Sequence, residues 1–304
     1  MKHVVSISLG SSSRNHSVEA EFLGEKFKIE RIGTDGDKKK AIQLIEELDG
    51  KVDAFGMGGI DLYICIGKKK YLLKDAANIA KAAKKTPIVD GSGLKNTLER
   101  KVIEYLNDEY GLKFKDKKVL LVCGMDRFGM AETFEKYKCD LTLGDVIFAL
   151  GIPIPLKSLK GLNVAATLLA PIVARLPFEL IYPTGEKQES SGGKKSKFGR
   201  FYRDSDIIAG DFHFIKKHMP ERLDGKIIIT NTVTPKDVDM LKEKGVNLLI
   251  TTTPNLNGRS FGTNVMEGVL VTLSGKELNE ITAKDYEDLL DKMDFKPRIE
   301  VLND

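Results

Sequence analysis

The 304-residue sequence has no tryptophan, only three cysteines and only four histidines, and these shortages exclude several kinds of protein. Cys65, Cys123 and Cys139 show no C-x-x-C spacing, so neither a disulfide framework nor a cysteine zinc site is predicted, and a reducing compartment is expected. The histidines form no H-E-x-x-H pattern. We therefore expect no metal site.

Long hydrophobic runs and a large charge excess are also missing. No stretch approaches the roughly 18 apolar residues that cross a bilayer, and the first strand-like run lacks the long apolar core of a signal peptide. We expect a cytoplasmic protein without a membrane partner. The 48 basic and 44 acidic side chains leave a formal net charge of +4, which gives no reason to expect nucleic acid as a partner. A homodimer is one assembly state compatible with the sequence.

What is present is a globular composition, with 41% hydrophobic and 30% charged residues over a length of about two domains. From residue 118 onward, short apolar runs alternate with helical segments, as is typical of a parallel sheet with crossover helices. The predicted strands are Val119–Cys123, Asp140–Leu143, Phe178–Tyr182, Asp206–Ala209, Ile227–Thr230 and Val246–Thr251. The predicted helices are Met130–Tyr137, Leu159–Arg175, Phe212–His218, Pro235–Lys244 and Val265–Leu273. This pattern predicts a Rossmann-like, doubly wound α/β domain over residues 113–276, with strand order 3-2-1-4-5-6.

The first half predicts a separate α/β domain, residues 1–112, that holds the substrate. Its expected strands are Val4–Leu9, Val18–Gly24, Glu25–Ile32, Val52–Gly58, Leu62–Gly67 and Thr86–Val89, the second and third forming a hairpin. Its expected helices are Asp37–Leu48, Lys74–Lys84 and Leu94–Tyr110. The tail, residues 277–304, carries a helix at Lys284–Met293 and a strand-like run at Pro297–Leu302, and we expect it to pack back on the first domain.

The turn after the first strand of the second domain is the strongest cofactor candidate. Gly124 and Gly129 precede a helix, as in the phosphate turn of a dinucleotide fold, where free N–H groups and the helix dipole bind a pyrophosphate. Asp126 stands where the pattern has its middle glycine, and Arg127, followed by Phe128, can offset that charge. The alternative is that Asp126 only caps the helix and that no nucleotide binds.

Two carboxylates after neighbouring strands extend this cofactor hypothesis. Asp145 comes 21 positions after Gly124, near the spacing of a carboxylate that binds a ribose 2′-hydroxyl, which favours NAD over NADP. It is equally open to an interpretation as a helix N-cap. Asp211 follows the fourth predicted strand, which flanks the same crevice, and His213 beside it is either a group that titrates near neutrality or a structural histidine.

The loop of residues 251–264 is the densest polar segment and leads into a helix N-terminus. We expect it to face the nicotinamide through Thr252, Thr253, Pro254 and Asn255; the alternative is a long turn that needs Gly and Asn for its backbone angles. Residues 184–204 form a Gly/Ser/Lys-rich segment, interpreted either as a solvated or disordered loop or as a lid over phosphates.

Three polar clusters follow predicted strands in the first domain, and each is also open to interpretation as turn chemistry. The expected substrate contacts are Ser11, Ser12, Ser13, Arg14, Asp61 and Asn96. Lys95 and Asp90 form the predicted catalytic pair, because an amine beside a carboxylate can move the proton of an alcohol if burial brings the pKa of the lysine toward neutrality.

The segments ISLGSSSRNHSVEAEFLGEKFKIERIGTDGD and VDAFGMGGIDLY resemble bacterial proteins of the quinate 5-dehydrogenase type, within the quinate/shikimate dehydrogenase group. The resemblance extends over most of the chain and implies a two-domain, NAD- or NADP-dependent oxidoreductase that acts on a small polyhydroxy carboxylic acid. The N-V-T-x-P-x-K-like motif of that group is missing from residues 1–110. The alternative is a non-redox small-molecule-binding or regulatory protein on a Rossmann-like scaffold.

Overall fold

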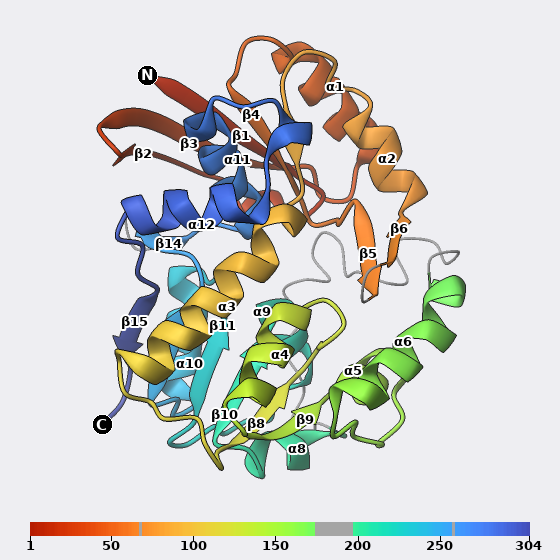
Figure 1. Cartoon of the computed structure of the whole chain (residues 1–304), viewed down its shortest axis with the longest axis vertical. Helices are drawn as coiled ribbons and strands as arrows, with labels where there is room; N and C mark the ends of the chain where they lie inside the picture. Colours follow the sequence, from red (N-terminus) through yellow and green to blue (C-terminus); the bar gives the residue numbers. More distant parts are fainter. Residues whose placement is uncertain (67–68, 174–196, 257–258) are drawn as a thin grey trace.

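The computed structural model describes residues 1–66, 69–173, 197–256 and 259–304. Its elements form two lobes, each built around its own sheet, as Figure 1 shows. Within the described residues, no helix combines the length and apolar character needed to cross a membrane. The predicted strand Phe178–Tyr182 and most of the segment 184–204 lie outside the described residues.

The first lobe contains a five-stranded sheet in the order β2-β3-β1-β4-β7, in which only β2 runs antiparallel to its neighbour. Its strands are β1 (Lys2–Ser8), β2 (His16–Phe22), β3 (Glu25–Gly33), β4 (Ala54–Gly58) and β7 (Ile88–Val89). The β2–β3 pair forms the expected hairpin. A separate antiparallel pair, β5 (Tyr63–Ile66) and β6 (Lys69–Leu72), follows β4.

Helices cover both faces of this sheet. Successive residues of a strand point to opposite faces, and successive residues of β1 are apolar and buried in two different cores. Val5 and Ile7 belong to the core with helices α1 (Lys38–Leu48) and α2 (Lys74–Ala80), whereas Val4 belongs to the core on the opposite face. Asp37 begins α1, since its carboxylate accepts hydrogen bonds from two backbone N–H groups of the first turn.

The second lobe contains a six-stranded sheet in the order β9-β8-β10-β11-β12-β15. Its strands are β8 (Lys118–Leu121), β9 (Asp140–Leu143), β10 (Ile207–Gly210), β11 (Ile227–Thr230), β12 (Leu248–Thr251) and β15 (Arg298–Val301). All are parallel except β15. Because β8 lies beside β10, the ends of these two strands meet, as the expected strand order requires.

Helices cover both faces of this second sheet, which confirms the doubly wound α/β prediction. One face packs on α4 (Phe128–Lys136) and α6 (Leu159–Val173), and the other on α8 (Gly199–Arg203), α9 (Phe212–His218) and α10 (Pro235–Glu243), with α5 (Asp145–Leu150) beside them. Residues of β10 alternate between these two cores, so the strand is apolar throughout, as is typical of a parallel strand buried on both sides.

Helix α3 (Ser92–Asp108) links the lobes and packs on α4, α11 (Thr263–Ser274) and α12 (Ala283–Lys292). Short elements complete the fold: η1 (Ser12–Arg14), β13 (Asn255–Leu256), β14 (Arg259–Ser260) and η3 (Leu278–Glu280).

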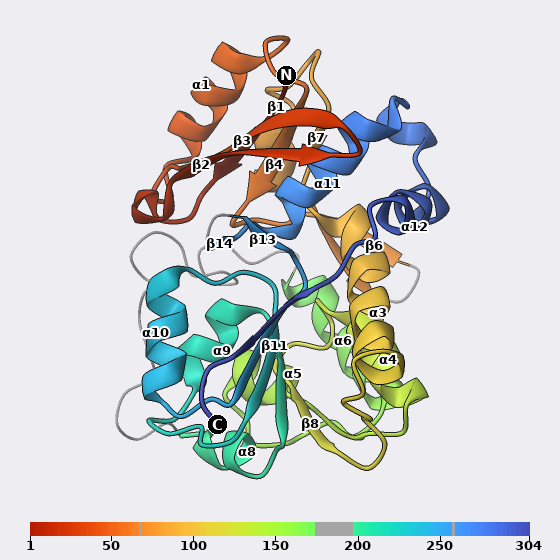
Figure 2. The same cartoon turned by 90° about the vertical axis from the view of Figure 1, so that its left-hand side faces the viewer.

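Two C-terminal segments lie elsewhere than the sequence predicted. Helix α11 was expected to complete the second domain, but it packs on β1 and β4 of the first lobe. Gly268 permits this close approach, since a Cβ there would lie 2.9 Å from Cγ1 of Val4. The final strand was expected on the first domain, whereas β15 pairs with β12 and covers an edge of the second sheet. Figure 2 shows this segment descending from α12 to the lower lobe.

Candidate functional site

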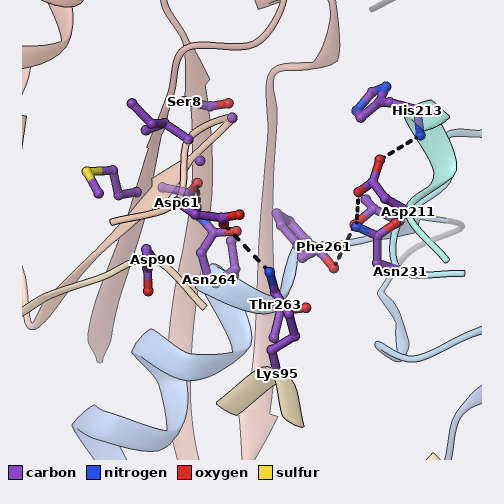
Figure 3. Close-up of a pocket in the computed structure, with 18 of the residues that line it drawn as sticks. Ser8, Asp61, Asp90, Lys95, Asp211, His213, Asn231, Phe261, Thr263 and Asn264 are labelled. Carbon is purple, nitrogen blue, oxygen red and sulfur yellow. Dashed lines mark hydrogen bonds and ion pairs between the residues drawn. The ribbon is translucent and has the colours of Figure 1, made fainter. Parts of the chain in front are cut away.

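A cavity of about 170 Å³ lies between the two lobes. It is lined by residues that follow β4 and β7 in the first sheet and by residues that follow β8, β10 and β11 in the second. The carboxyl ends of parallel strands from both sheets therefore face one another across the cavity, and this is where ligands of open α/β sheets bind. Figure 3 shows Asp61, Asp90 and Asn264 on one side and Asp211, His213 and Asn231 on the other.

Lys95, in the first turns of α3, reaches into this cavity and pairs with carboxylates of both lobes. Its Nζ lies 2.8 Å from Oδ1 of Asp126 and 3.7 Å from Oδ1 of Asp61. Burial alone would lower the pKa of Lys95, but the two carboxylates outweigh it and hold that pKa above its usual value. The condition set for proton transfer by Lys95, a pKa shifted toward neutrality, is therefore not met, because the carboxylates favour the cation.

Arg127 is the centre of a second set of ion pairs beneath the cavity. The guanidinium pairs with buried Glu99 of α3, and its Nη2 lies 3.3 Å from Oδ2 of Asp211. Its Nε lies 3.1 Å from Oδ2 of Asp126. Burial would raise the pKa of Asp126, but Lys95 and Arg127 together hold it well below its ordinary value. The pocket thus presents ionised carboxylates whose charge is already balanced.

Asp211 and His213 are brought to the cavity by the start of α9. Asp211 caps this helix, with Oδ1 accepting from the backbone N–H of His213, while Oδ2 accepts from Nδ2 of Asn231 at 2.8 Å. Nε2 of His213 lies 2.7 Å from Nη1 of Arg14 in the other lobe. Burial and the charge of Arg14 lower the pKa of His213 to about 4, so the ring is neutral at pH 7 and Nε2 accepts from the guanidinium.

The first-lobe wall is held by close packing against α11. Nδ2 of Asn264 donates to Oγ of Ser6 at 2.8 Å, and Nη2 of Arg31 donates to Oγ of Ser8 at 3.0 Å. Gly91, at the start of α3, has a φ of +93°, and a Cβ there would lie 2.8 Å from the backbone nitrogen of Asn264. Only glycine meets both conditions without strain.

The predicted pair of Lys95 and Asp90 is not what the structure shows, since the partners of Lys95 are Asp126 and Asp61. Asp90 lines the cavity, but its oxygens accept from the backbone N–H groups of Leu62 at 2.5 Å and Ser92 at 2.9 Å. Asp90 thus fixes the backbone where α3 begins.

In the turn after β8, the backbone N–H donors of Gly124, Met125 and Gly129 are already bonded to side chains of the protein. The backbone N–H of Gly124 donates to Oδ2 of Asp145 at 2.9 Å and that of Met125 to Oδ1 of the same side chain at 2.8 Å. The N–H of Gly129 donates to Oδ1 of Asn96 at 3.0 Å. Asp145 is buried behind the turn, so the structure contradicts its predicted contact with a ribose. These residues do not fit a pyrophosphate as they stand.

The loop of residues 251–264 divides into two parts. Thr252 and Thr253 are fully buried, and Oγ1 of Thr253 donates to backbone carbonyls of Asn231 and Phe261, so they shape the loop. They and Pro254 do not line the cavity, and the side chain of Asn255 lies outside the described residues. The part that lines the cavity runs from Ser260 to Asn264.

Among the other predicted contacts, Arg14, Asp61, Asp126, Arg127 and Asp211 line the cavity. The remainder do not, namely Ser11, Ser12, Ser13, Asn96, Gly124, Phe128, Gly129 and Asp145. The three serines lie at η1, where Ser11 caps the turn and the N–H of Ser12 donates to Asp35.

Sequence reasoning missed Arg31, Asn231 and the serines of β1 as pocket residues. Asn231 directly follows β11, so its position at a strand end was a usable signal. Ser6 and Ser8 alternate with buried Val5 and Ile7, and that alternation was likewise visible. Arg31 lies inside a hairpin strand, and no sequence pattern distinguishes it from a solvent-exposed arginine.

The lining carries equal numbers of opposite charges. Its basic side chains are Arg14, Arg31, Lys95 and Arg127, and its carboxylates are Asp61, Asp90, Asp126 and Asp211. Phe214 and Phe261 add two aromatic side chains. Among the residues that the structure describes, no three His, Cys, Asp or Glu side chains are grouped to hold a metal ion.

Comparison with solved structures gives distant likenesses. A galactofuranose binding protein is 11% identical, with 97% of this chain and 99% of that chain covered and a TM-score of 0.33. L-tryptophan dehydrogenase from Nostoc punctiforme is 10% identical, with 96% and 80% covered and a TM-score of 0.35. Hetero-hexameric glutamate dehydrogenase from Thermus thermophilus is 12% identical, with 96% and 74% covered and a TM-score of 0.40. Likeness at this level does not bear on function, and a comparison with curated proteins gave no match.

Two family descriptions match the sequence itself. "Domain of unknown function (DUF8753)" matches residues 3–90, and "Domain of unknown function (DUF8754)" matches residues 93–302. The two matches meet at the start of α3, the helix that links the lobes. The resemblance to quinate/shikimate dehydrogenases stays a prediction. Because the second match spans well over half of its length, the chain belongs to the family described as Domain of unknown function (DUF8754).

Proposed function

We propose that the protein binds one small polyhydroxylated molecule, of the size of a single sugar ring or a cyclic polyhydroxy acid, in the cavity between the lobes. The observation that carries this proposal is the charge-balanced lining around about 170 Å³ at the facing strand ends. That volume is below the roughly 300–1,000 Å³ of pockets for drug-sized ligands. The ligand is therefore small.

The chemistry of the lining favours hydroxyl groups. Carboxylates accept hydrogen bonds and basic side chains donate them, while a hydroxyl does both, so each ion pair offers a polyol a donor and an acceptor. The four cations and four carboxylates balance, which favours a ligand of low net charge. The apolar sides of Phe214 and Phe261 suit the C–H faces of a ring.

The structure favours a role for Lys95 in binding over a role in acid–base catalysis. A general acid or base works best with a pKa near the working pH. The carboxylates of Asp126 and Asp61 move the pKa of Lys95 away from neutrality, and the pKa of Asp126 is lowered by Lys95 and Arg127 against the effect of its burial. These groups are suited to holding a ligand through charge-assisted hydrogen bonds.

Calorimetric titration with a panel of neutral sugars, cyclic polyols and polyhydroxy acids, including quinate and shikimate, tests the proposal. We expect a member of the panel to bind and Lys95→Met to weaken it by about tenfold or more, because a hydrogen bond to a charged group contributes about 1.5–3 kcal/mol. Lys101→Met is the matched control, since Lys101 lies on the same helix and pairs with Asp291 outside the cavity. Equal loss in both variants, or no ligand at all, contradicts the proposal.

A second candidate is NAD(P)-dependent oxidation of a hydroxyl group on such a ligand, as the resemblance to quinate/shikimate dehydrogenases implies. The doubly wound sheet and the position of the cavity at its strand ends favour this candidate. The hydrogen-bonded turn after β8 opposes it. Separate titrations with NAD, NADH, NADP and NADPH decide: micromolar binding of any one supports it, and no binding of all four excludes it.

A further inference from the structure

The turn after β8 has the form of an anion site, and the structure places a carboxylate in it. Asp145, the first residue of α5, directs both carboxylate oxygens at consecutive backbone N–H groups, those of Gly124 at 2.9 Å and Met125 at 2.8 Å. A phosphate bound at such a turn accepts from backbone N–H groups in the same way.

Both of these amides are already bonded to Asp145, and the turn is closely packed around Gly124. A Cβ at Gly124 would lie 3.2 Å from Oδ2 of Asp145, 2.8 Å from Cδ2 of Leu143 and 3.1 Å from Cδ2 of Leu162. Asp145 is 5% exposed, and burial raises the pKa of its carboxyl group to about 6 although both amides favour the ionised form. An ionised side chain that is buried at this cost is held there by its partners.

Other N–H groups of the turn also have partners from the protein. That of Arg127 donates to the backbone carbonyl of Cys123 at 3.2 Å, and that of Gly129 to Oδ1 of Asn96 at 3.0 Å. A Cβ at Gly129 would lie 2.8 Å from the backbone oxygen of Asn96, so this glycine serves the contact between α3 and α4. Both glycines of the expected phosphate pattern are thus explained by packing within the chain.

We propose that the carboxylate of Asp145 is the resident anion of the turn after β8 and excludes the phosphate groups of a dinucleotide from it. The second lobe then serves as one wall of the pocket between the lobes instead of as a nucleotide-binding domain. This inference does not depend on which molecule the pocket binds, because Asp145 does not line that pocket.

Titration with inorganic pyrophosphate and with NADH, followed by ¹H–¹⁵N NMR, tests the inference. We expect neither probe to shift the amide signals of Gly124 and Met125 in the wild-type protein. Asp145→Ala frees both N–H groups, and we expect pyrophosphate to bind this variant at least about tenfold more tightly, since each hydrogen bond to an anion contributes about 1.5–3 kcal/mol. Wild-type binding at these two amides, or a folded Asp145→Ala variant with no gain, overturns the inference.

A second readout applies even if Asp145→Ala does not fold. In the wild-type protein, the amide protons of Gly124 and Met125 report the ionisation of Asp145, with a midpoint near its pKa of about 6. The isosteric Asp145→Asn variant removes that titration. The neighbouring titratable groups are Asp126, whose pKa is lowered by Lys95 and Arg127 despite burial, and Cys123, whose pKa burial raises, so neither produces this midpoint. If the two amides show no titration that Asp145→Asn abolishes, the carboxylate is not their partner.

The two proposals fail separately. Loss of polyol binding in Lys95→Met with unchanged Gly124 and Met125 signals supports the pocket and leaves Asp145 in place. Wild-type NADH binding at the turn overturns the role of Asp145 without affecting the polyol titrations.

Discussion

The Nζ atom of Lys95 lies 2.8 Å from Oδ1 of Asp126, so an ion pair joins the helix that links the lobes to the first turn of the second lobe. Asp126 in turn lies beside Arg127, which pairs with Glu99 of the same linking helix and with Asp211 after the neighbouring strand β10. The charges that line the pocket are therefore also the charges that connect α3 to the second sheet.

Arg127 is the residue whose loss we expect to destabilise the protein most among these. Arg127→Met leaves Glu99 buried without its cation, and breaking a buried ion pair in this way costs about 3–5 kcal/mol. We expect that loss in the free energy of unfolding measured with urea. The double variant Glu99→Met/Arg127→Met should recover part of it, because the buried unpaired charge is then absent.

The control for this experiment is the exposed pair of Lys136 and Glu104, 2.7 Å apart on the surface. Lys136→Met should change the free energy of unfolding by less than about 1 kcal/mol. If Arg127→Met is no more destabilising than Lys136→Met, the buried network does not contribute as described.

Removing Arg14 should raise the pKa of His213. Burial and the charge of Arg14 hold that pKa at about 4, and Nη1 of Arg14 lies 2.7 Å from the ring. In Arg14→Met we expect the pKa, measured by NMR titration of the ring protons, to move toward 6.5 without reaching it, because the burial remains. His218 serves as the internal standard, since burial and Lys217 set its pKa at about 4. Equal shifts of both histidines contradict a direct effect of Arg14.

The same pKa predicts a loss of stability in acid. A folded pKa of about 4 lies below the roughly 6.5 of an unfolded histidine. The stabilisation from neutral His213 is therefore complete above pH 6.5 and is lost as the pH falls from 6.5 toward 4. We expect the free energy of unfolding of the wild-type protein to fall more steeply across this window than that of His213→Gln. Parallel curves would falsify the assignment.

For Glu267 we expect the opposite pH dependence, with the free energy of unfolding falling as the pH rises. Burial and the nearby Asp90 raise its pKa to about 7, although Tyr286 and the N–H of Gly91 donate to it. A raised carboxyl pKa gives stability that is complete below the unfolded value of about 4.3 and is lost as the pH rises through 7. Relative to Glu267→Gln, the wild type should lose about 3 kcal/mol between pH 4 and 8. The measured quantity is the change of the free energy of unfolding with pH. Its absolute value is less informative, since Glu267→Gln also changes a hydrogen bond at every pH.

Gly91 should tolerate a side chain less well than Gly111, although both have positive φ values of +93° and +87°. A Cβ at Gly91 would lie 2.8 Å from the backbone nitrogen of Asn264, whereas one at Gly111 meets nothing within 4 Å. Gly111→Ala should cost about 1 kcal/mol of backbone strain, and Gly91→Ala clearly more. Because Asn264 lines the pocket, only Gly91→Ala should also weaken ligand binding. Similar effects of the two substitutions on urea unfolding would contradict this prediction, because the close contact with Asn264 would then have no energetic cost.

Much of the fold could be predicted because its strands and helices have strong local patterns. The apolar runs of β8, β10 and β11 are short and bounded by polar turns, and α9 was predicted at its observed bounds, Phe212–His218. Asp211, which caps it, is a local signal. The lobe on which α11 packs could not be predicted, since its apolar face suits either sheet. The pairing of β15 with β12 likewise depends on which sheet edge lies nearby, a property of the folded chain.

The sequence predicted several residues of the candidate site, but it did not predict which of them pair with one another. Lys95, Asp61 and Asp126 were each recognised as polar groups at strand ends, but the sequence paired Lys95 with Asp90, its neighbour along the chain. The true partners lie 34 and 31 positions away and meet Lys95 only because α3 crosses between the lobes. Asp145 was recognised by its spacing after Gly124, and that spacing is also what brings its carboxylate to the turn.

The most direct measurement of the central claim is a ¹H–¹⁵N NMR titration of the wild-type protein with the panel of sugars, cyclic polyols and polyhydroxy acids. We predict that a bound member shifts amide signals on both sides of the pocket, those of Asp61 and Asn264 together with those of Asn231 and His213, and leaves Gly124 unchanged. The account is contradicted if no member of the panel shifts these signals, or if the shifts are confined to Gly124 and Met125.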